Sequence, residues 1–237
     1  PTAILNESTT TDFTFKDVAG ILKEYVILND TDFYRPETVA NAKVANQNLH
    51  ALQDLNYIVI TNSELSAQAQ RLADYHQNNS NFTTRVVLLE EIYNEFSSGS
   101  PDITGIRDFI KHLYDSNSSE DKKLKYVCFF GDASYDYKDR LQGNNNAVPV
   151  KLSTISFNLA NSWVTDDFFV MMDADEGGMA SNHTVDVASS RIPVSTIAEA
   201  TAVVDKILNY YSKNSIGDWR NTITLVADDI DAAGEEV

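Results

Sequence analysis

The sequence predicts an α/β fold built on a parallel sheet with helices on both faces. The first observation is the apolar run Tyr126–Phe130, which is too short for a helix and rich in aromatic and β-branched residues. Such a run is typical of a strand that is buried on both faces. The second observation is that similar runs recur at Tyr57–Thr61, 85–89 and 222–229. The third is that segments with helical spacing separate these runs, which favours a doubly wound sheet.

Residues 1–50 have a different character. Short strands are predicted at residues 13–15 and 25–28, and polar turns separate them. We therefore expect this segment to be the end of a preceding β-rich region followed by a linker. The chain opens at Pro1 without a recognisable signal peptide, so we also expect it to be a piece of a longer protein.

Three segments carry apolar residues at helical spacing. The first starts near Ser63 and ends around residues 78–81, the second follows Asp102, whose carboxylate suits an N-cap, and the third opens at Ser195. Their apolar stripes are, in order, Leu65, Ala69, Leu72 and Ala73; Ile103, Ile106, Phe109, Ile110 and Leu113; and Ala198, Ala202, Val203, Ile207 and Tyr210.

The segment between Asp139 and the third helix is looser. Residues 142–147 are rich in Asn and predict a mobile connection. The runs at 168–172 and 185–189 predict a pair of hairpin strands around an acidic turn at 173–178.

Composition restricts the function. The sequence contains 35 acidic residues against 18 Lys and Arg, a net charge of −17. A chain this acidic repels nucleic acid and anionic membrane surfaces, so neither is expected as a direct partner, whereas acidic loops suit divalent cations. No segment is long and apolar enough to insert into a membrane, and one cysteine excludes an internal disulfide.

A search for a catalytic nucleophile gives a negative answer. The sequence has no Gly-x-Ser-x-Gly, P-loop, His-Glu-x-x-His or Cys-x-x-Cys motif. Cys128 lies within an apolar strand, where burial raises a thiol pKa, so we interpret it as a core residue. The sequence pairs none of the four histidines with Cys128; they are His50, His76, His112 and His183.

Carboxylates cluster in three loops. Closely spaced carboxylates can be brought together by a hard cation such as Ca²⁺, but each cluster taken alone is better explained as a solvated acidic turn. The clusters are Asp132, Asp136 and Asp139; Asp166 and Asp167; and Asp173, Asp175 and Glu176.

Several short stretches, in matching order, resemble one family. They cover nearly all of the chain after residue 46 and comprise residues 46–50, 57–61, 129–132, 135–136, 164–168, 190–194, 206–210 and 219–229. Together they resemble the gingipain-type cysteine peptidases (family C25, caspase-like fold), and within them the PorU-type signal peptidases, or sortases, of the type IX secretion system.

This resemblance implies a three-layer caspase-like catalytic unit of two subdomains. Residues 51–217 would form the first subdomain and residues 218–237 the first strand of the second. The family's catalytic His, in a Gly-His-Gly motif, and its catalytic Cys follow later, and this chain contains neither motif. Asp229, with Asp228 next to it, best matches the acid that supports the catalytic His. Glu236 falls near the acid that selects substrates in arginine-specific relatives. The resemblance also implies structural Ca²⁺, with Asp132, Asp136, Asp166 and Asp167 as candidate ligands.

The function implied is that of a cell-surface or outer-membrane endopeptidase that removes C-terminal signals from secreted cargo. Its partners would be peptide substrates and other components of the secretion machinery, and this chain alone would be inactive. The alternative is a non-catalytic caspase-like module that docks partners through its acidic rim. A flavodoxin-like nucleotide binder is disfavoured because no glycine-rich turn follows Thr61.

Overall fold

The computed structural model divides into two units, Pro1–Ala45 and Asn46–Val237. In the first unit, the described residues lie in no helix or strand; they include Tyr25, Val26 and Leu28, where the sequence predicted a strand. The strand predicted at 13–15 lies outside the described residues. The residues that the structure describes are 16, 18, 20–26, 28, 31–35, 37, 43–155, 157–158, 161–180 and 182–225.

The second unit is organised by a four-stranded parallel sheet. Its strands are β1 (Tyr57–Thr61), β2 (Thr84–Leu88), β3 (Tyr126–Phe130) and β6 (Ala188–Ile192), arranged in the order β2-β1-β3-β6. The continuous apolar runs at β1 and β3 therefore predicted both strands with their bounds. The chain steps from β1 outward to β2 and then returns past β1 to β3, so the crossing helices fall on opposite faces.

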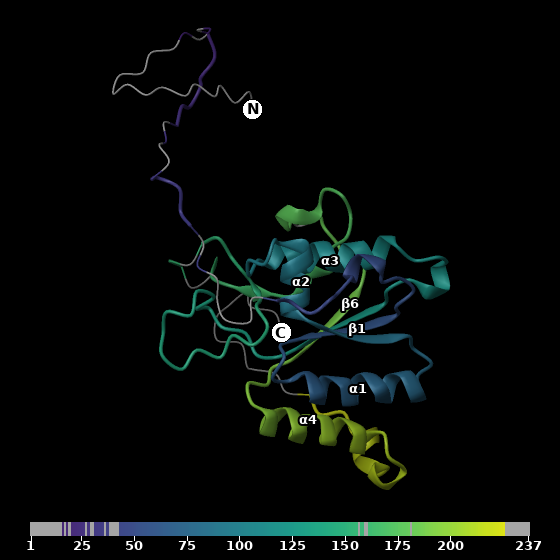
Figure 1. Cartoon of the computed structure of the whole chain (residues 1–237). Helices are drawn as coiled ribbons and strands as arrows, with labels where there is room; N and C mark the ends of the chain where they lie inside the picture. Colours follow the sequence, from purple (N-terminus) through teal and green to yellow (C-terminus); the bar gives the residue numbers. More distant parts are fainter. Residues whose placement is uncertain are drawn as a thin grey trace, which may run out of the picture. The chain divides into compact units, whose positions relative to one another are not determined.

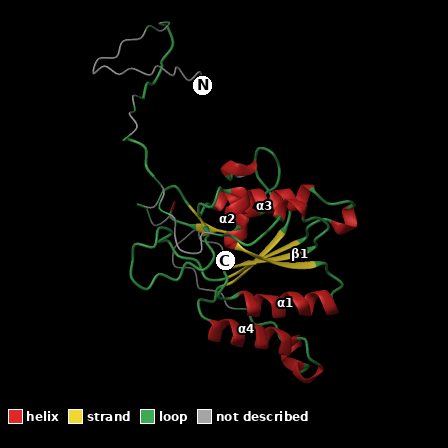
Figure 2. Ribbon diagram, viewed as in Figure 1, coloured by secondary structure: helices red, strands yellow, loops and turns green. Residues whose placement is uncertain are grey.

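Two pairs of helices cover the sheet, one pair on each face (Figures 1 and 2). On one face lie α2 (Leu89–Phe96) and α3 (Ile103–Asp115), and on the other lie α1 (Ser66–Asn79) and α4 (Ile197–Tyr210). Successive strand residues point to opposite faces. Ile58, Ile60, Val127 and Phe129 pack with α2 and α3, whereas Tyr57, Val59, Cys128 and Phe130 pack with α1 and α4. The predicted three-layer α/β fold is confirmed.

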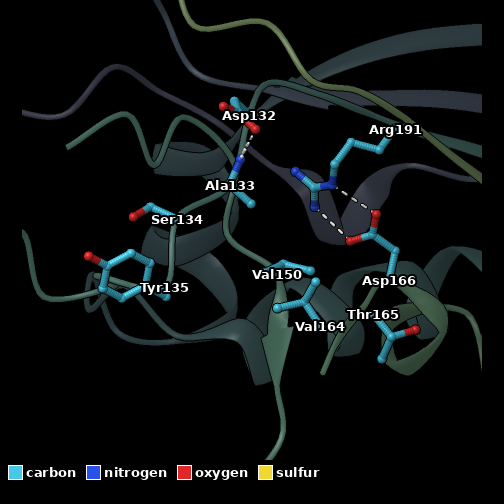
Figure 3. A pocket seen from close by; sticks show the side chains of 9 residues that line it. All are labelled: Asp132, Ala133, Ser134, Tyr135, Val150, Val164, Thr165, Asp166 and Arg191. Carbon is cyan, nitrogen blue, oxygen red and sulfur yellow. Dashed lines mark hydrogen bonds and ion pairs between the residues drawn. The ribbon is translucent and has the colours of Figure 1, made fainter. Parts of the chain in front are cut away.

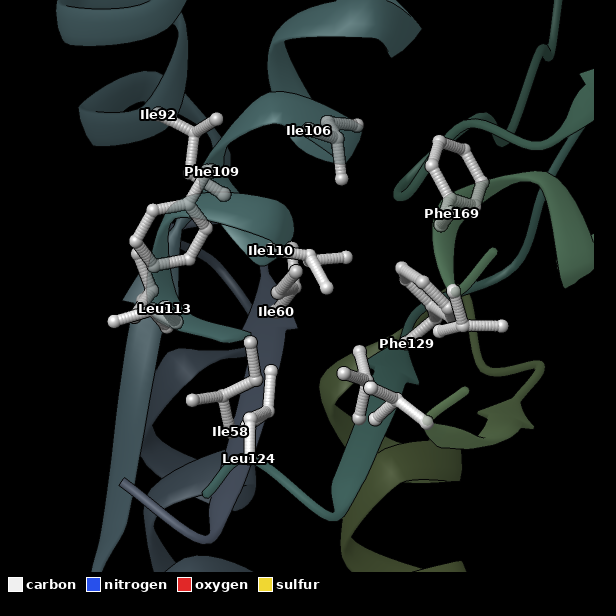
Figure 4. Packing of buried hydrophobic residues seen from close by; sticks show 14 of the residues in the cluster. Ile58, Ile60, Ile92, Ile106, Phe109, Ile110, Leu113, Leu124, Phe129 and Phe169 are labelled. Atoms are coloured by element: carbon white, nitrogen blue, oxygen red, sulfur yellow. The ribbon is translucent and has the colours of Figure 1, made fainter. Parts of the chain in front are cut away.

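The core under α2 and α3 is fully apolar at its centre (Figure 4). Ile106, Phe109 and Ile110 of α3 have no exposed surface and pack against the sheet. Asp102 caps α3 as predicted, because its carboxylate accepts the amide N–H of Thr104 at 2.8 Å. Helix α2 was not predicted, since Leu89 at its start reads as the last residue of the apolar strand run.

The predicted stripe of α4 is confirmed in part, because Val203 and Ile207 pack against the core. Ala200 and Val204 are the fully buried residues of this helix, and Ala198, Ala202 and Tyr210 are exposed. The apolar residues of α4 extend over more than one face, so a stripe one or two positions away from the true one fits the 3.6-residue period nearly as well.

The predicted hairpin of 168–172 and 185–189 is also wrong. Residues 168–172 are buried, but they form a 3₁₀ turn and an irregular segment rather than a strand, and 188–192 instead joins the parallel sheet beside β3. Side chains, rather than a neighbouring strand, supply hydrogen bonds to the backbone of this segment. Arg107 donates to the carbonyl of Met171 and Lys111 to that of Met172, while the Asp186 carboxylate accepts the N–H of Met172. A short buried run can satisfy its backbone in this way without being a strand.

The remaining elements are short. Strands β4 (Lys151–Leu152) and β5 (Val164–Thr165) form an antiparallel pair. The described part of the strand predicted at 222–229, residues 222–225, lies in no strand, and its remainder is outside the described residues. None of the helices in the described ranges is long and apolar enough to cross a bilayer. In the described ranges, the 3₁₀ helices are η1 (Leu49–Ala51), η2 (Glu120–Lys122), η4 (Asp167–Phe169), η5 (Glu176–Gly178), η6 (Lys213–Ser215) and η7 (Asp218–Asn221).

Candidate functional site

A cavity of about 360 Å³ opens beyond the carboxyl ends of β3 and β6, the end of a parallel sheet where ligands usually bind (Figure 3). Gly131 ends β3 and turns the chain toward it with φ at +156°. A side chain at Gly131 would meet Val148 and Ala147 at 2.7 and 3.0 Å, so the close approach of these segments requires glycine. The lining residues are Asp132, Ala133, Ser134, Tyr135, Val150, Val164, Thr165, Asp166 and Arg191.

Arg191 of β6 holds one wall of the cavity together. Its Nε and one Nη donate to the two carboxylate oxygens of Asp166 at 2.8 and 2.7 Å. The other N–H groups donate to the carbonyl oxygens of Gly131, Val148 and Pro149 at 2.9, 2.8 and 3.1 Å. All five guanidinium donors are therefore used, and both charged side chains are mostly buried, at 15% and 17% exposure. Arg191 is a structural connector with no donor left for a ligand.

Asp132 lies on another wall of the cavity and has only neutral partners. One carboxylate oxygen accepts the N–H of Ala133 at 2.9 Å, and the other accepts the Asn145 amide at 2.7 Å and the Ser195 hydroxyl at 3.4 Å. The backbone of Asp132 is fixed as well, since its N–H donates to Val194 and its carbonyl accepts from Val148. The strand end, the 145–148 segment and the start of α4 therefore meet at this residue.

Asp136 is committed to its own loop. Its side chain is buried, and one carboxylate oxygen accepts the amide N–H groups of Arg140 and Leu141, both at 2.6 Å. The neighbouring Asp139 has a left-handed backbone (φ +51°) and accepts from Asn144. The carboxylates of Asp136 and Asp139 therefore form hydrogen bonds within their own loop and stabilise its turn.

The four candidate calcium ligands do not converge. Asp132 and Asp166 line the same cavity, but Asp166 gives both oxygens to Arg191, Asp136 bonds within its turn, and Asp167 is exposed. No group of three or more His, Cys, Asp or Glu side chains within the described ranges could hold a metal ion. Because Ca²⁺ takes six to eight oxygen ligands, these residues alone do not fit it, and calcium binding stays a prediction that would need other ligands.

Cys128 is a core residue, as the sequence indicated. It is 1% exposed in β3, and burial raises the pKa of its thiol, although hydrogen bonds with Ser190 and Tyr57 act in the opposite direction. The same burial raises the pKa of the Tyr57 hydroxyl. A buried thiol with a raised pKa is a poor nucleophile.

The histidines have structural contacts of their own. The ring of His50 stacks on Phe96 with centroids 4.4 Å apart and bonds Glu95 at 2.8 Å, and His112 contacts the His50 carbonyl at 3.1 Å. His76 packs edge-on against Tyr57, and burial lowers its pKa. His183 accepts the N–H of Ala180. Since all four histidines lie in described segments, the chain assembles no histidine–cysteine hydrogen bond.

Asp228, Asp229 and Glu236, the acids assigned to catalysis and substrate binding, lie outside the described residues. Their assignment stays a prediction. Arg191, by contrast, organises the cavity and received no role from the sequence. The sequence offers no strong signal for this role, because β6 reads Ala-Ser-Ser-Arg-Ile and is not an apolar run. Only the burial of the guanidinium obliges the fold to satisfy its five N–H donors.

Comparisons with known proteins identify relatives of this chain. The family model of peptidase family C25 matches residues 50–237. The crystal structure of dimeric latent PorU from Porphyromonas gingivalis is similar, with a TM-score of 0.63 and 32% identity, over 76% of this chain and 18% of the PorU chain. A structure described as a protease has a TM-score of 0.44 and 17% identity, over 66% of this chain and 28% of its own. No curated protein matches significantly.

Proposed function

The chain belongs to peptidase family C25, as its sequence motifs predicted, and on this premise we propose that it forms the first subdomain of a gingipain-type cysteine endopeptidase. The observation that supports this most directly is the family match over residues 50–237 together with the parallel three-layer fold. The chain spans 18% of the length of the PorU chain that it resembles, so the activity belongs to a larger protein.

The reactive cysteine and histidine of that enzyme lie outside these 237 residues. The state of Cys128 supports this part of the proposal, because its thiol is buried, has a raised pKa and bonds Tyr57 and Ser190 rather than a histidine. In the complete enzyme a thiolate, activated by a histidine that takes its proton, attacks a peptide carbonyl and forms an acyl-enzyme as the amine leaves.

The acids at 228 and 229 would support that histidine. A carboxylate that accepts the imidazole N–H fixes the tautomer and stabilises the imidazolium formed during the reaction. Asp229 is the first candidate and Asp228 the second, and Glu236 is the candidate for substrate contact. No calcium is needed for this chemistry.

The proposed substrates are peptides that carry a C-terminal signal. The 32% identity with PorU supports a sortase role, in which C-terminal signals are removed from secreted cargo at the cell surface and the acyl group passes to a surface acceptor. Peptide substrates and other components of type IX secretion are the partners in this proposal.

The test compares the 237-residue chain with the full-length protein on peptides that carry a C-terminal signal. We expect cleavage by the full-length protein only, and no change when Cys128 is replaced by Ser in it. Replacing Asp229 with Asn is expected to lower kcat by about 10²–10⁴-fold, with Asp228→Asn as the matched comparison.

Two results would overturn the proposal. One is peptidase activity of the 237-residue chain that disappears in Cys128→Ser. The other is a full-length protein that binds cargo but cleaves none, which would favour a non-catalytic docking module.

A further inference from the structure

Aromatic side chains form a continuous surface on α1, α4 and the turn that follows α4; the two helices lie side by side on one face of the sheet (Figure 1). The rings of Tyr75 and Tyr211 stack with their centroids 5.2 Å apart. Tyr210 contacts Tyr211 edge-on at 5.5 Å and Trp219 edge-on at 5.7 Å. Tyr210, Tyr211 and Trp219 are 46%, 54% and 56% exposed. Single exposed apolar residues are normal, but a contiguous group of this kind marks an interaction site.

A groove of about 660 Å³ lies beside these rings. One wall is an outward face of α4, because its residues follow one another at helical spacing. The other wall comes from the turn after the helix. Aromatic rings beside a shallow apolar groove, with charged side chains at the border, are typical of the centre of a protein–protein interface. The lining residues are Ala202, Asp205, Lys206, Asn209, Tyr210, Ser215 and Trp219.

Arg220 holds the rings of Tyr210 and Trp219 in place. Its guanidinium carbon lies 4.3 Å from the centroid of the first ring and 5.2 Å from that of the second. The guanidinium also donates to the Tyr210 carbonyl and the Ser215 hydroxyl. Gly217 leaves room for the indole, since a Cβ there would lie 2.9 Å from Trp219. Because rings that are already held lose little conformational entropy on binding, this surface is prepared for a partner.

The chain leaves this surface with exposed apolar residues of its own. Thr222 has an extended backbone, and the next apolar residues, Ile223 and Leu225, are 86% and 89% exposed. Residues two apart in an extended segment point to the same side, so both can be covered by one partner. The chain spans 18% of the PorU chain, and in a protein of that length the following polypeptide is tethered beside the groove. A short tether gives an effective concentration on the order of millimolar, which favours this polypeptide over a free partner.

A second copy of the chain is the main competitor for the groove. Each copy has a net charge of −17, so two copies repel each other before any contact forms. A tethered segment does not have to overcome this repulsion between separate molecules. Charge therefore also favours an occupant from the same polypeptide.

We propose that the α4 groove, together with the rings of Tyr210, Tyr211 and Trp219, is the docking surface for the polypeptide that follows residue 237 in the full-length protein. The inference rests on the proposed function, in which this chain is the first subdomain of a larger catalytic unit. The docked segment presents apolar side chains to the rings, which are the residue types that contribute most to binding at interfaces.

The experiment compares the oxidation of aromatic side chains by hydroxyl radicals in the 237-residue chain and in the full-length protein. Mass spectrometry locates the oxidised residues, and a reporter peptide added to both samples normalises the rates. We expect Tyr211 and Trp219 to react at least about threefold more slowly in the full-length protein, because an interface excludes solvent from its centre. Equal rates for Trp219 in the two proteins would overturn the proposal.

Matched variants locate the contact. Ala202→Glu places a charged side chain in the groove, whereas Ala198→Glu makes the same change one turn earlier, at an exposed position of α4 outside the lining. In the full-length protein, oxidation of Trp219 should rise at least about threefold in Ala202→Glu and stay unchanged in Ala198→Glu, because a charge is costly to bury. Both alanines are exposed, so the melting temperature of the 237-residue chain should change by less than about 2 °C in either variant. The same response in both full-length variants would contradict docking in this groove.

Dilution distinguishes the tethered occupant from a second copy. Contact within one polypeptide does not depend on protein concentration, so protection of Trp219 in the full-length protein should persist on about tenfold dilution. Protection that appears in the concentrated 237-residue chain and disappears on dilution would replace the tethered segment by a second copy. None of these measurements needs peptide cleavage. An inactive full-length protein with a protected Trp219 would count against the proposed function alone, and an active one with an unprotected Trp219 would count against this surface alone.

Discussion

The two ends of the parallel sheet are constructed differently. At the amino ends of the strands, hydrogen bonds of Asn56 connect neighbouring loops. The Asn56 side-chain amide donates to the backbone carbonyls of Asp121 and Lys123 at 3.1 and 3.2 Å. The backbone carbonyl of Asn56 accepts the N–H groups of Lys125 and Tyr126. Asn56 thereby connects the entries to β1 and β3.

Asp54 completes the amino end. Its left-handed backbone (φ +59°) directs the carboxylate to the N–H and hydroxyl of Ser118, at 2.7 and 2.8 Å, and to the ammonium of Lys122 at 3.0 Å. Asp54 and Lys122 of this loop therefore form an ion pair.

At the carboxyl ends, Arg191 performs a similar connecting role but leaves a cavity beside it, and Asp132 in that cavity has no cationic partner. The hydrogen bonds at the amino end thus connect loops around neutral or paired groups, whereas those at the carboxyl end border a cavity in which the Asp132 carboxylate has only neutral donors. Four substitutions test this contrast.

Replacing Arg191 with Met should have the largest effect. The change leaves the mostly buried Asp166 carboxylate and three carbonyls unpaired, so we expect the free energy of unfolding to fall by about 3–5 kcal/mol, measured by urea denaturation. Arg71→Met is the control, because the Arg71–Asp205 pair is exposed and is expected to contribute about 0–1 kcal/mol. Similar losses in both variants would contradict the connecting role of Arg191.

Asn56→Ala should come next. The substitution leaves the carbonyls of Asp121 and Lys123 without their donor in a nearly buried position, and we expect a loss of about 1–3 kcal/mol. Asn79→Ala removes a comparable amide-to-carbonyl bond at the exposed end of α1 and should change stability by less than about 0.5 kcal/mol. The same denaturation assay compares them, and an equal effect at both positions would show that the amino end is not specially closed.

Gly131→Ala should act on the carboxyl end with a smaller cost, about 1–2 kcal/mol, through its left-handed backbone and the contact with Val148. The new methyl group must displace the 147–150 segment, which lines the cavity. We therefore expect amide resonances of Val148 and Val150 to shift, whereas Gly143→Ala, at a left-handed glycine in open space, should leave them unchanged. Unshifted resonances in Gly131→Ala would argue against this packing.

Asp54→Asn should give the smallest effect, visible through its pH dependence. Hydrogen bonds from the Ser118 N–H, Lys122 and the Ser118 hydroxyl hold the pKa of Asp54 below its ordinary value of 3.8. When the pKa of a carboxyl group is lower in the folded than in the unfolded state, its ionised form stabilises the fold at every pH above the unfolded-state pKa. This stabilisation is lost as the pH falls through the pKa of the folded state. The native chain should thus be more stable than Asp54→Asn near neutral pH, and the difference should shrink below about pH 3.8, in thermal melts across the acid range. A constant difference at all pH values would contradict this assignment, and Asp205→Asn serves as the exposed control.

The sequence predicted the parts of the fold that depend on continuous or periodic burial. Tyr57–Thr61 and Tyr126–Phe130 are apolar throughout because both faces of a central parallel strand are covered, so their pattern identifies them without any partner. The apolar stripe of α1 and the N-cap at Asp102 were predictable for the same reason, because each depends on residues that are neighbours in the sequence. By contrast, residues 168–172 are as apolar as a strand but satisfy their backbone through Arg107, Lys111 and Asp186, which are remote in sequence.

The candidate site was predicted only in outline. The sequence placed Asp132 beyond the end of a parallel strand, and this position is confirmed. It could not place Asp166 beside Arg191, since 25 residues separate them and only the packing of β6 on β3 brings them together. It also could not distinguish Asp132, which lines the cavity, from Asp136, which bonds within its own turn, because both are aspartates in one polar loop.

The family, the parallel α/β layering and the core role of Cys128 were readable from the sequence, because they depend on residue types and on the apolar pattern of single segments. Only the tertiary contacts establish which carboxylate at the carboxyl end pairs with Arg191 and which has neutral donors alone. Charge compensation depends on distances of a few ångströms between segments far apart in the chain, and local patterns contain no record of such distances.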